Sequence, residues 1–256
     1  RPDPAVEMLM HNVRGAVAVC VGAVAASLEH ADRTFALYDA RAHRGLATVH
    51  GEDPALASHH FAALAQWIAG RPAVAARHLA AGLALCDEHD ISLWGSGARI
   101  LRGGALAASG RVDEGRGLVD QGRRAWADTG AVLIQPFWLG VAARVEAAGG
   151  RPARAMRLLD EALVTAHRTG ERWYEAELHR QRGELALALP GSAARQSAQG
   201  LADLERAAEL AARQGARLFE ARACVGLASW CLQNRRIGAV SATLARARQA
   251  LRDAAG

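Results

Sequence analysis

The stretch GGALAASGRVDEGRGLVDQG, which runs from Gly103 to Gly122, decides the fold of this chain. Small residues stand at its start and seven, twelve and nineteen residues later. Glycine inside a helix costs up to ~1 kcal/mol against alanine, so close packing between helices is needed to offset it. The spacing predicts two helices that meet closely at Gly103, Gly115 and Gly122. Gly110 is expected to end the first helix in a left-handed conformation.

The same spacing recurs along the chain with a period of about 40 residues. The residues that correspond to Gly103 in the other copies are Gly15, Ala63, Ala143, Gly183 and Gly226. In three of these copies a glycine again follows after seven residues, at Gly22, Gly70 and Gly150. A fixed period of this length is typical of helical repeats, whose units bury their apolar faces against their neighbours. We therefore predict an all-α, right-handed solenoid of six helix pairs that forms a single domain over residues 1–256.

The pattern also places the helix boundaries. The predicted pairs cover residues 5–38, 54–88, 91–128, 131–168, 171–213 and 216–252. Their helices are expected at 5–21 and 23–38, 54–69 and 72–88, 91–109 and 112–128, 131–148 and 152–168, 171–188 and 197–213, and 216–233 and 236–252. Two inserts interrupt the period, at 39–53 and 189–197. The first insert holds His43, Arg44, His50 and Asp53. It either caps the solenoid, packs on its edge or has a role of its own.

Composition agrees with a helical protein and excludes several kinds of chemistry. Alanine, leucine and arginine dominate, and all are good helix formers. All 31 basic residues are arginine, so neither a phosphate-loop lysine nor a Schiff-base lysine exists. The net charge of +5 permits nucleic-acid contact without requiring it. Four scattered cysteines do not form a disulfide framework, which favours the cytoplasm.

No motif in the sequence indicates a catalytic, cofactor or metal site. Gly115-x-Gly117-x-x-Asp120 falls within a predicted helix and lacks the last glycine of a dinucleotide loop. His59 and His60 are adjacent, so on a helix they point about 100° apart and do not easily hold one metal ion. We expect a binding and scaffolding surface rather than an enzyme.

The small-residue spacing resembles the tetratricopeptide repeat, although the usual period of that repeat is about 34 residues. Two stretches carry a more specific resemblance. They are YDARAHR (Tyr38–Arg44) with GEDPALASHHFAALAQWIAGRP (Gly51–Pro72), and TGERWYEAELHRQRGELAL (Thr169–Leu187). Both are similar to the C-terminal repeat region of bacterial multidomain regulators, including the maltose-regulon activator group. Those regulators join an AAA-type ATPase module, often with an adenylate cyclase or LuxR-type helix-turn-helix domain, to a tetratricopeptide-like tail.

The resemblance covers nearly the whole chain and implies a regulatory tail. No nucleotide-binding loop, cyclase core or DNA-reading motif occurs in these residues, so the output domain is expected elsewhere in a parent protein. The chain also begins at Arg1 without an initiator methionine, which suggests a piece of a longer protein.

In such solenoids the inner faces of the first helices line a groove. Residues six and three before the small residue, and one and four after it, share that face. The polar or bulky residues at these positions are Asn12, His60, Trp67, Ile100, Phe137, Arg144, Glu177, Arg180, Glu184 and Trp230. The tryptophans also suit a core position, and the charged residues also suit pairing with one another.

Three functional hypotheses follow. The first is a cytoplasmic regulatory domain, with no membrane contact, that binds a partner protein, a peptide or another domain of its own parent chain in the groove. The second is a sensor of a small-molecule effector. The third is nucleic-acid binding through arginines near the C-terminus, namely Arg235, Arg236, Arg246, Arg248 and Arg252. The last helix, with Val240, Leu244 and Leu251, either faces solvent or pairs with a second copy.

Overall fold

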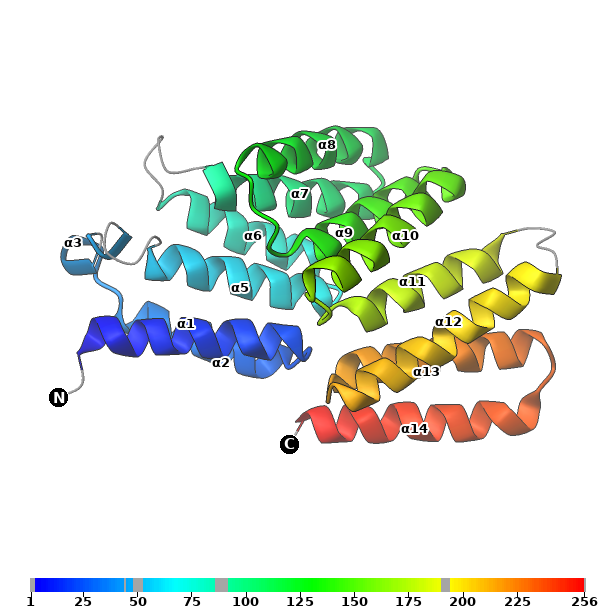
Figure 1. Cartoon of the computed structure of the whole chain (residues 1–256). Helices are drawn as coiled ribbons and strands as arrows, with labels where there is room; N and C mark the ends of the chain where they lie inside the picture. Colours follow the sequence, from blue (N-terminus) through cyan, green and yellow to red (C-terminus); the bar gives the residue numbers. More distant parts are fainter. Residues whose placement is uncertain (1–2, 44, 48–52, 86–91, 190–193, 256) are drawn as a thin grey trace. The chain divides into compact units, whose positions relative to one another are not determined.

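The computed structural model describes residues 3–43, 45–47, 53–85, 92–189 and 194–255. These residues form helices and connecting turns, and no strand occurs among them (Figure 1). Contacts between Cα atoms divide the chain into two compact units, Arg1–Ala131 and Val132–Gly256. No helix of the described part is long and apolar enough to cross a membrane.

The described residues of the first unit form three helix pairs, with a short helix between the first two pairs. The elements are α1 (Pro4–Cys20), α2 (Val24–Leu37), α3 (Ala40–His43), α5 (Pro54–Ile68), α6 (Pro72–Leu83), α7 (Ser92–Ala108) and α8 (Val112–Asp128). Helix α5 packs against α6 within its own pair, against α1 and α2 of the preceding pair, and against α7 of the following pair. Thirteen of its 15 residues are buried, Ala57 and Leu64 among them, so α5 forms the centre of this unit.

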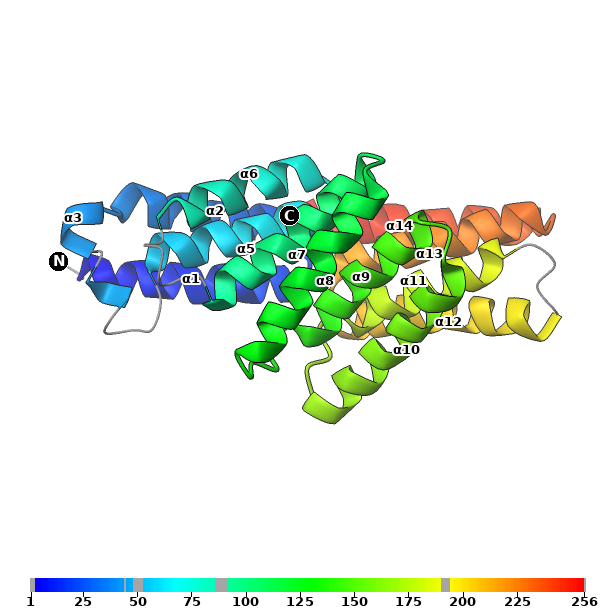
Figure 2. The same ribbon diagram turned by 90° about the horizontal axis from the view of Figure 1, so that it is seen from above.

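The second unit repeats this arrangement. Its helices are α9 (Gln135–Ala148), α10 (Pro152–Thr169), α11 (Glu175–Ala188), α12 (Ala194–Arg213), α13 (Arg217–Gln233) and α14 (Ile237–Ala255). Helix α11 packs against α12, against α9 and α10 of the preceding pair, and against α13 of the following pair (Figure 2). First helices that contact their own partner and both neighbouring pairs are the packing of an α-solenoid. The predicted fold class is confirmed.

The small residues lie where the sequence pattern predicts close helix contacts. A Cβ atom added to Gly103 of α7 would lie 2.5 Å from the carbonyl oxygen of Gly115 on α8, and one added to Gly122 would lie 2.7 Å from Ile100. In the second unit, a Cβ atom on Gly183 of α11 would lie 2.7 Å from a backbone oxygen of α12. These glycines are thus required by the approach of two backbones.

The turns between paired helices also follow the prediction. The four glycines predicted to end first helices have positive φ angles, from 69° at Gly22 to 91° at Gly110. A left-handed residue after the last helical turn lets the backbone N–H groups that follow bond back to the helix carbonyls. Here the N–H of Arg111 donates to the carbonyl of Leu106 at 2.9 Å. The next helix then begins one residue later, at Val112.

Several predicted boundaries are wrong by three or more residues. Helices α9 and α11 begin at Gln135 and Glu175, four residues later than expected, because turns precede both. Ile134, just before α9, has a left-handed φ of 61°, and its N–H donates to the Glu171 carboxylate at 2.8 and 2.9 Å. Helix α12 begins at Ala194, so residues 194–197 of the predicted insert are helical. Helix α6 ends at Leu83, and residues 86–88 of that predicted helix lie outside the described residues.

The insert at 39–53 contains α3 and ends on a helix cap. Asp53 is buried and accepts hydrogen bonds from the N–H groups of Ala55 and Leu56 at 2.9 and 3.0 Å, which caps α5. The hydroxyl of Tyr38, at the end of α2, donates to Asp53 at 2.6 Å. These contacts give Asp53 a structural role at the start of α5. Arg44 and His50 lie outside the described residues.

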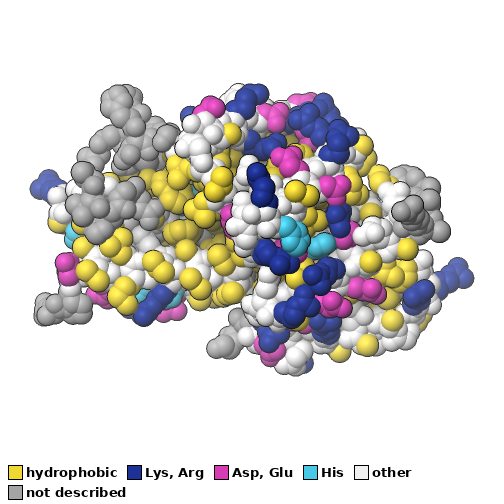
Figure 3. All heavy atoms as spheres, in the orientation of Figure 1, with side chains coloured by type: hydrophobic (Ala, Val, Ile, Leu, Met, Phe, Trp, Pro, Cys, Tyr) yellow, Lys and Arg dark blue, Asp and Glu magenta, His cyan; other side chains and the backbone are white. Residues whose placement is uncertain are grey.

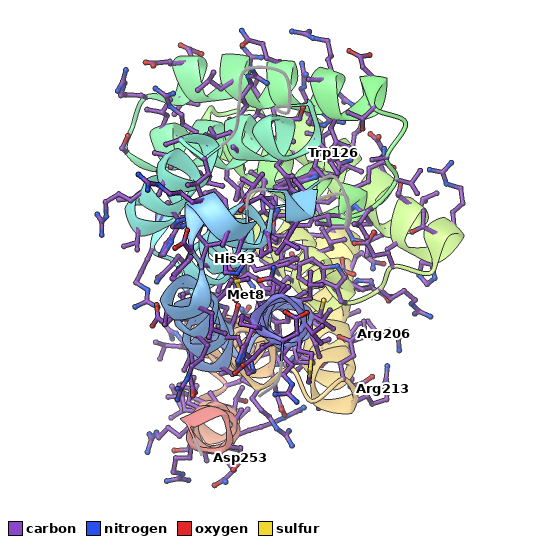
Figure 4. The ribbon with its side chains drawn as sticks, turned by 90° about the vertical axis from the view of Figure 1, so that its left-hand side faces the viewer. Met8, His43, Trp126, Arg206, Arg213 and Asp253 are labelled. Atoms are coloured by element: carbon purple, nitrogen blue, oxygen red, sulfur yellow. The ribbon has the colours of Figure 1, made fainter. Side chains whose placement is uncertain are left out.

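The helices carry buried side chains on one face and exposed side chains on another. Met8 of α1 is fully buried, whereas Arg206 and Arg213 of α12 are exposed (Figure 4). Figure 3 shows apolar side chains along α1 and α5, and a mixture of arginine, acidic and histidine side chains over α10, α11 and α12.

Candidate binding groove

Two neighbouring pockets open on the first helices of the second unit. The pocket between α9 and α11 has a volume of about 360 Å³, and the pocket between α11 and α13 about 470 Å³. Both are lined by Glu184 and Ala188 of α11, so they adjoin one another. The first is lined further by Ala143, Arg144, Ala147, Leu159, Arg180, Gln181 and Leu185. The second is lined further by Leu187, Leu204, Val225, Gly226, Ser229, Trp230 and Gln233. We call these two pockets together the groove.

The groove lies at the C-terminal halves of α9, α11 and α13. At the N-terminal ends of these helices, packed aromatic side chains fill the space between them. Phe137, Tyr174 and Phe219 stand near the starts of these three helices, and all are buried. The ring of Tyr174 lies 4.8 Å from that of Phe137 and 6.0 Å from that of Phe219. Phe137, predicted as a groove residue, is therefore part of the core.

A charged network adjoins the two pockets and includes Arg180 and Glu184 of their lining. Glu177 of α11 is 1% exposed, and Arg180 donates two hydrogen bonds to its carboxylate, at 2.9 and 3.0 Å. Arg222 of α13 reaches the same carboxylate at 3.5 Å. Arg180 also donates to Glu184 at 2.6 Å. The network links buried Glu177 to Glu184, which is exposed at the groove.

The pKa shifts show that this network stays ionised. Burial alone would raise the pKa of Glu177, but Arg180, Arg222 and Arg144 outweigh it and lower the pKa of this carboxyl below its ordinary value. Burial opposes the charge of Arg180 too, yet Glu177 and Glu184 raise the pKa of the guanidinium. Burial, with Glu177 nearby, raises the pKa of Tyr174 to about 12. Arginine and carboxylate charges are thus fixed in place at neutral pH.

The remaining lining residues combine a cation and an aromatic ring. Arg144 of α9 is exposed. Trp230 of α13 is partly exposed, and the guanidinium of Arg236 lies 4.8 Å from the centre of its ring. An apolar pocket wall with a few fixed polar groups is typical of sites that bind peptides or small ligands.

The structure brings five of the ten predicted residues together here: Arg144, Glu177, Arg180, Glu184 and Trp230. The other four, besides Phe137, belong to the first unit, where they are buried: Asn12, His60, Trp67 and Ile100. Asn12 is a packing residue, because its amide donates to the carbonyl of Pro54 at 3.0 Å and accepts from Ser58. The ring of His60 packs 4.3 Å from that of Trp94. Trp67 is buried as well, so it is a core residue.

Sequence reasoning missed Arg222 and Arg236. Arg222 stands four residues before Gly226, just outside the four positions assigned to the inner face, yet its long side chain reaches Glu177. Arg236 comes from the turn before α14 and lies over Trp230.

A further pocket lies on the opposite side of α11. It has a volume of about 690 Å³ and is lined by Met156, Asp160, Arg182, Ala186, Gln196, Gln199 and Asp203. Arg182 binds Asp203 at 2.7 and 2.9 Å and Asp160 at 2.9 Å, and Asp203 also accepts from His179 at 2.9 Å. The charged residues of its lining thus bind one another. We favour the groove because its pockets repeat along three successive first helices.

The C-terminal arginines proposed for nucleic acid are partly engaged within the second unit. Arg246 pairs with Glu220 at 2.8 Å and donates to the carbonyl of Ala208 at 3.2 Å. Arg252 bonds to Gln249 in its own helix at 2.9 Å. Within the described residues, no three His, Cys, Asp or Glu side chains gather in a way that would hold a metal ion.

One solved structure similar to this chain is the apo form of RapI. It matches with a TM-score of 0.65 and 11% sequence identity, over 98% of this chain and 85% of RapI. The two proteins share a helical fold. At this identity the similarity carries no information about ligand or activity. No protein-family model matches the chain, and no curated protein matches it by sequence.

Proposed function

We propose that this chain is a regulatory protein-interaction domain that binds a segment of a partner protein, or of its own parent chain, in the groove. The observation that carries the proposal is the pair of adjoining pockets over α9, α11 and α13, with Arg144, Glu184 and Trp230 in their walls. Their linear arrangement suits an extended or helical segment that places successive side chains in successive pockets. Arg144 and Trp230 are residue types that often dominate interface energies.

The resemblance of residues 38–44, 51–72 and 169–187 to the tails of bacterial signalling ATPases supports a finer proposal. Binding in the groove would be transmitted to an attached ATPase, cyclase or DNA-binding module. In the intact parent chain, Arg144→Glu is expected to change partner recovery and output together. Unchanged recovery and unchanged output would contradict this proposal.

The chain itself provides a direct test. A random linear peptide library is panned against the full chain, and enriched peptides are measured by calorimetry. We expect Arg144→Glu and Trp230→Ala to weaken binding at least tenfold, which corresponds to about 1.4 kcal/mol. Arg157→Glu, at an exposed residue of α10, and Leu232→Ala, at a residue 60% exposed, are matched controls that should leave affinity unchanged. Equal loss in the controls, or no enrichment at all, would contradict the proposal.

A small-molecule effector is the second candidate, because each pocket lies within the roughly 300–1,000 Å³ range of ligand sites. A metabolite that raises the melting temperature of the wild type, but not of Trp230→Ala, would favour this candidate. Failure of peptide panning together with that result would replace the partner-segment proposal.

A further inference from the structure

Two histidine pairs of the first unit share one geometry at equivalent repeat positions. The Nδ1 atoms of His11 on α1 and His30 on α2 lie 3.0 Å apart. The Nδ1 atoms of His59 on α5 and His78 on α6 lie 3.3 Å apart. In both pairs the second histidine follows the first by 19 residues, and the first stands four residues before the small residue of its helix. Two successive hairpins therefore carry the same constellation.

These distances match two nitrogens that share a metal ion. With Zn–N bonds of about 2.0–2.1 Å and an angle of roughly 90–109° between them, the two nitrogens lie about 2.9–3.4 Å apart. Imidazole nitrogen suits zinc, copper and nickel. We propose that each histidine pair binds one divalent ion of this class between the two helices of its hairpin, with water completing the coordination.

The local environment favours the neutral, metal-binding form of three of these imidazoles, those of His30, His59 and His78. Burial and the neighbouring His78 lower the pKa of His59 to about 4. Burial also lowers the pKa of His78, although Asp32 acts in the opposite direction and Arg77 in the same one. The four rings are only partly buried, which leaves room for an ion to enter.

The electrostatic surroundings of His30, in the first pair, are similar. Burial, His11 and Arg14 lower the pKa of His30, against the opposite effect of Glu29. The negative charges of Glu29 near His30 and Asp32 near His78 favour a bound cation. The positive charges of Arg14 and Arg77 oppose it. In the second pair, Phe35 packs 4.4 Å from the ring of His59 and restricts its orientation.

The second unit carries an ion-paired carboxylate instead of a second histidine at the equivalent position. There His179 of α11 faces Asp203 of α12, with a separation of 2.9 Å. Arg182 donates to both oxygens of that carboxylate and so takes the place that a cation would occupy. No basic side chain is shown bonded to the two pairs of the first unit, where both partners are histidines.

Equilibrium dialysis of the full chain against zinc chloride or nickel chloride near pH 7.5 tests the proposal. We expect two bound ions per chain, one in His30→Gln or His78→Gln, and none in the double variant. Glutamine keeps a hydrogen-bonding partner for the remaining histidine but is a much weaker ligand for these metals. His167→Gln on α10 is the control and should still bind two ions.

Melting curves give a second readout. Zinc should raise the melting temperature of the wild type and of His167→Gln, and leave that of the double variant unchanged. A wild type that retains no ion would show that the pairs are hydrogen-bonded only, and the proposal would be wrong. Equal ion binding by the double variant would place the metal on other residues and would overturn it as well.

Discussion

Helices α5 and α11 occupy the same place in their respective units but present different chemistry at equivalent positions. Where α5 carries Ala57, His60 and Leu64, all buried and uncharged at neutral pH, α11 carries Glu177, Arg180 and Glu184. The small residue between them is Ala63 in α5 and Gly183 in α11. The comparison shows that small residues set the spacing of the helices, whereas the face beside them is free to become a sealed core or a groove with fixed charges.

The largest expected effect comes from breaking the buried charges of α11. Glu177→Gln leaves Arg180 with its main buried partner neutralised, and removing one member of a buried pair costs about 3–5 kcal/mol. Urea unfolding should show this loss. The exposed pair Arg111–Glu114 of the first unit is the control, because Glu114→Gln should cost less than about 0.5 kcal/mol. A cost below about 1 kcal/mol for Glu177→Gln would mean that the network does not hold α11 in place.

The next effect tests the feature that both units share. Gly103→Ala forces the backbones of α7 and α8 apart and should cost about 2–3 kcal/mol despite the better helix propensity of alanine. Gly117 lies in α8 with no atom within 4 Å of an added Cβ, so Gly117→Ala should stabilise the chain by up to ~1 kcal/mol. Thermal or urea unfolding measures both. Effects of the same sign would remove the argument for close contact at Gly103.

Acid should affect the two units in different pH ranges. Burial lowers the pKa of His60 to about 3 from an ordinary value of 6.5, so the unfolded chain binds more protons between these values. The contribution of neutral His60 to the free energy of unfolding is therefore fully present above about pH 6.5. It decreases as the pH falls, by about 2 kcal/mol at pH 5. His60→Phe should make this decline shallower, and the part that comes from His59, whose pKa is lowered to about 4, should remain. If wild type and variant show the same slope between pH 7.5 and 5, His60 is not the cause.

The second unit should respond only at lower pH. Burial alone would raise the pKa values of Glu177 and Asp203. Nearby arginines outweigh this effect at Glu177, and hydrogen bonds from His179 and Arg182 outweigh it at Asp203, so both pKa values are lowered. Their contribution is present above the unfolded pKa values of 4.5 and 3.8 and is lost as the pH falls through the lower folded values.

The repeat pattern predicted the helix pairs well because small residues report directly on backbone distance. Gly103 and Gly115 are informative because any side chain there would collide with the partner helix. The starts of α9 and α11 were less predictable, since the turn before α9 depends on Ile134 bonding to Glu171, 37 residues away. No local pattern contains that contact.

The groove could be predicted only in part, for a similar reason. Position on a helix face identified Arg144 and Glu184, but it could not tell that the same face is buried at His60 and Trp67. Burial depends on which side chains come from neighbouring helices. The histidine pairs, by contrast, had a sequence signal in their repeated spacing of 19 residues.

The central claim is that partner segments bind across the C-terminal halves of α9, α11 and α13. Hydrogen–deuterium exchange of the full chain, with and without a peptide selected by panning, tests it most directly. The account predicts increased protection around Arg144, Glu184 and Trp230, with little change in α10, α12 and the first unit. Protection confined to α10 and α12, or to α1–α8, would contradict it.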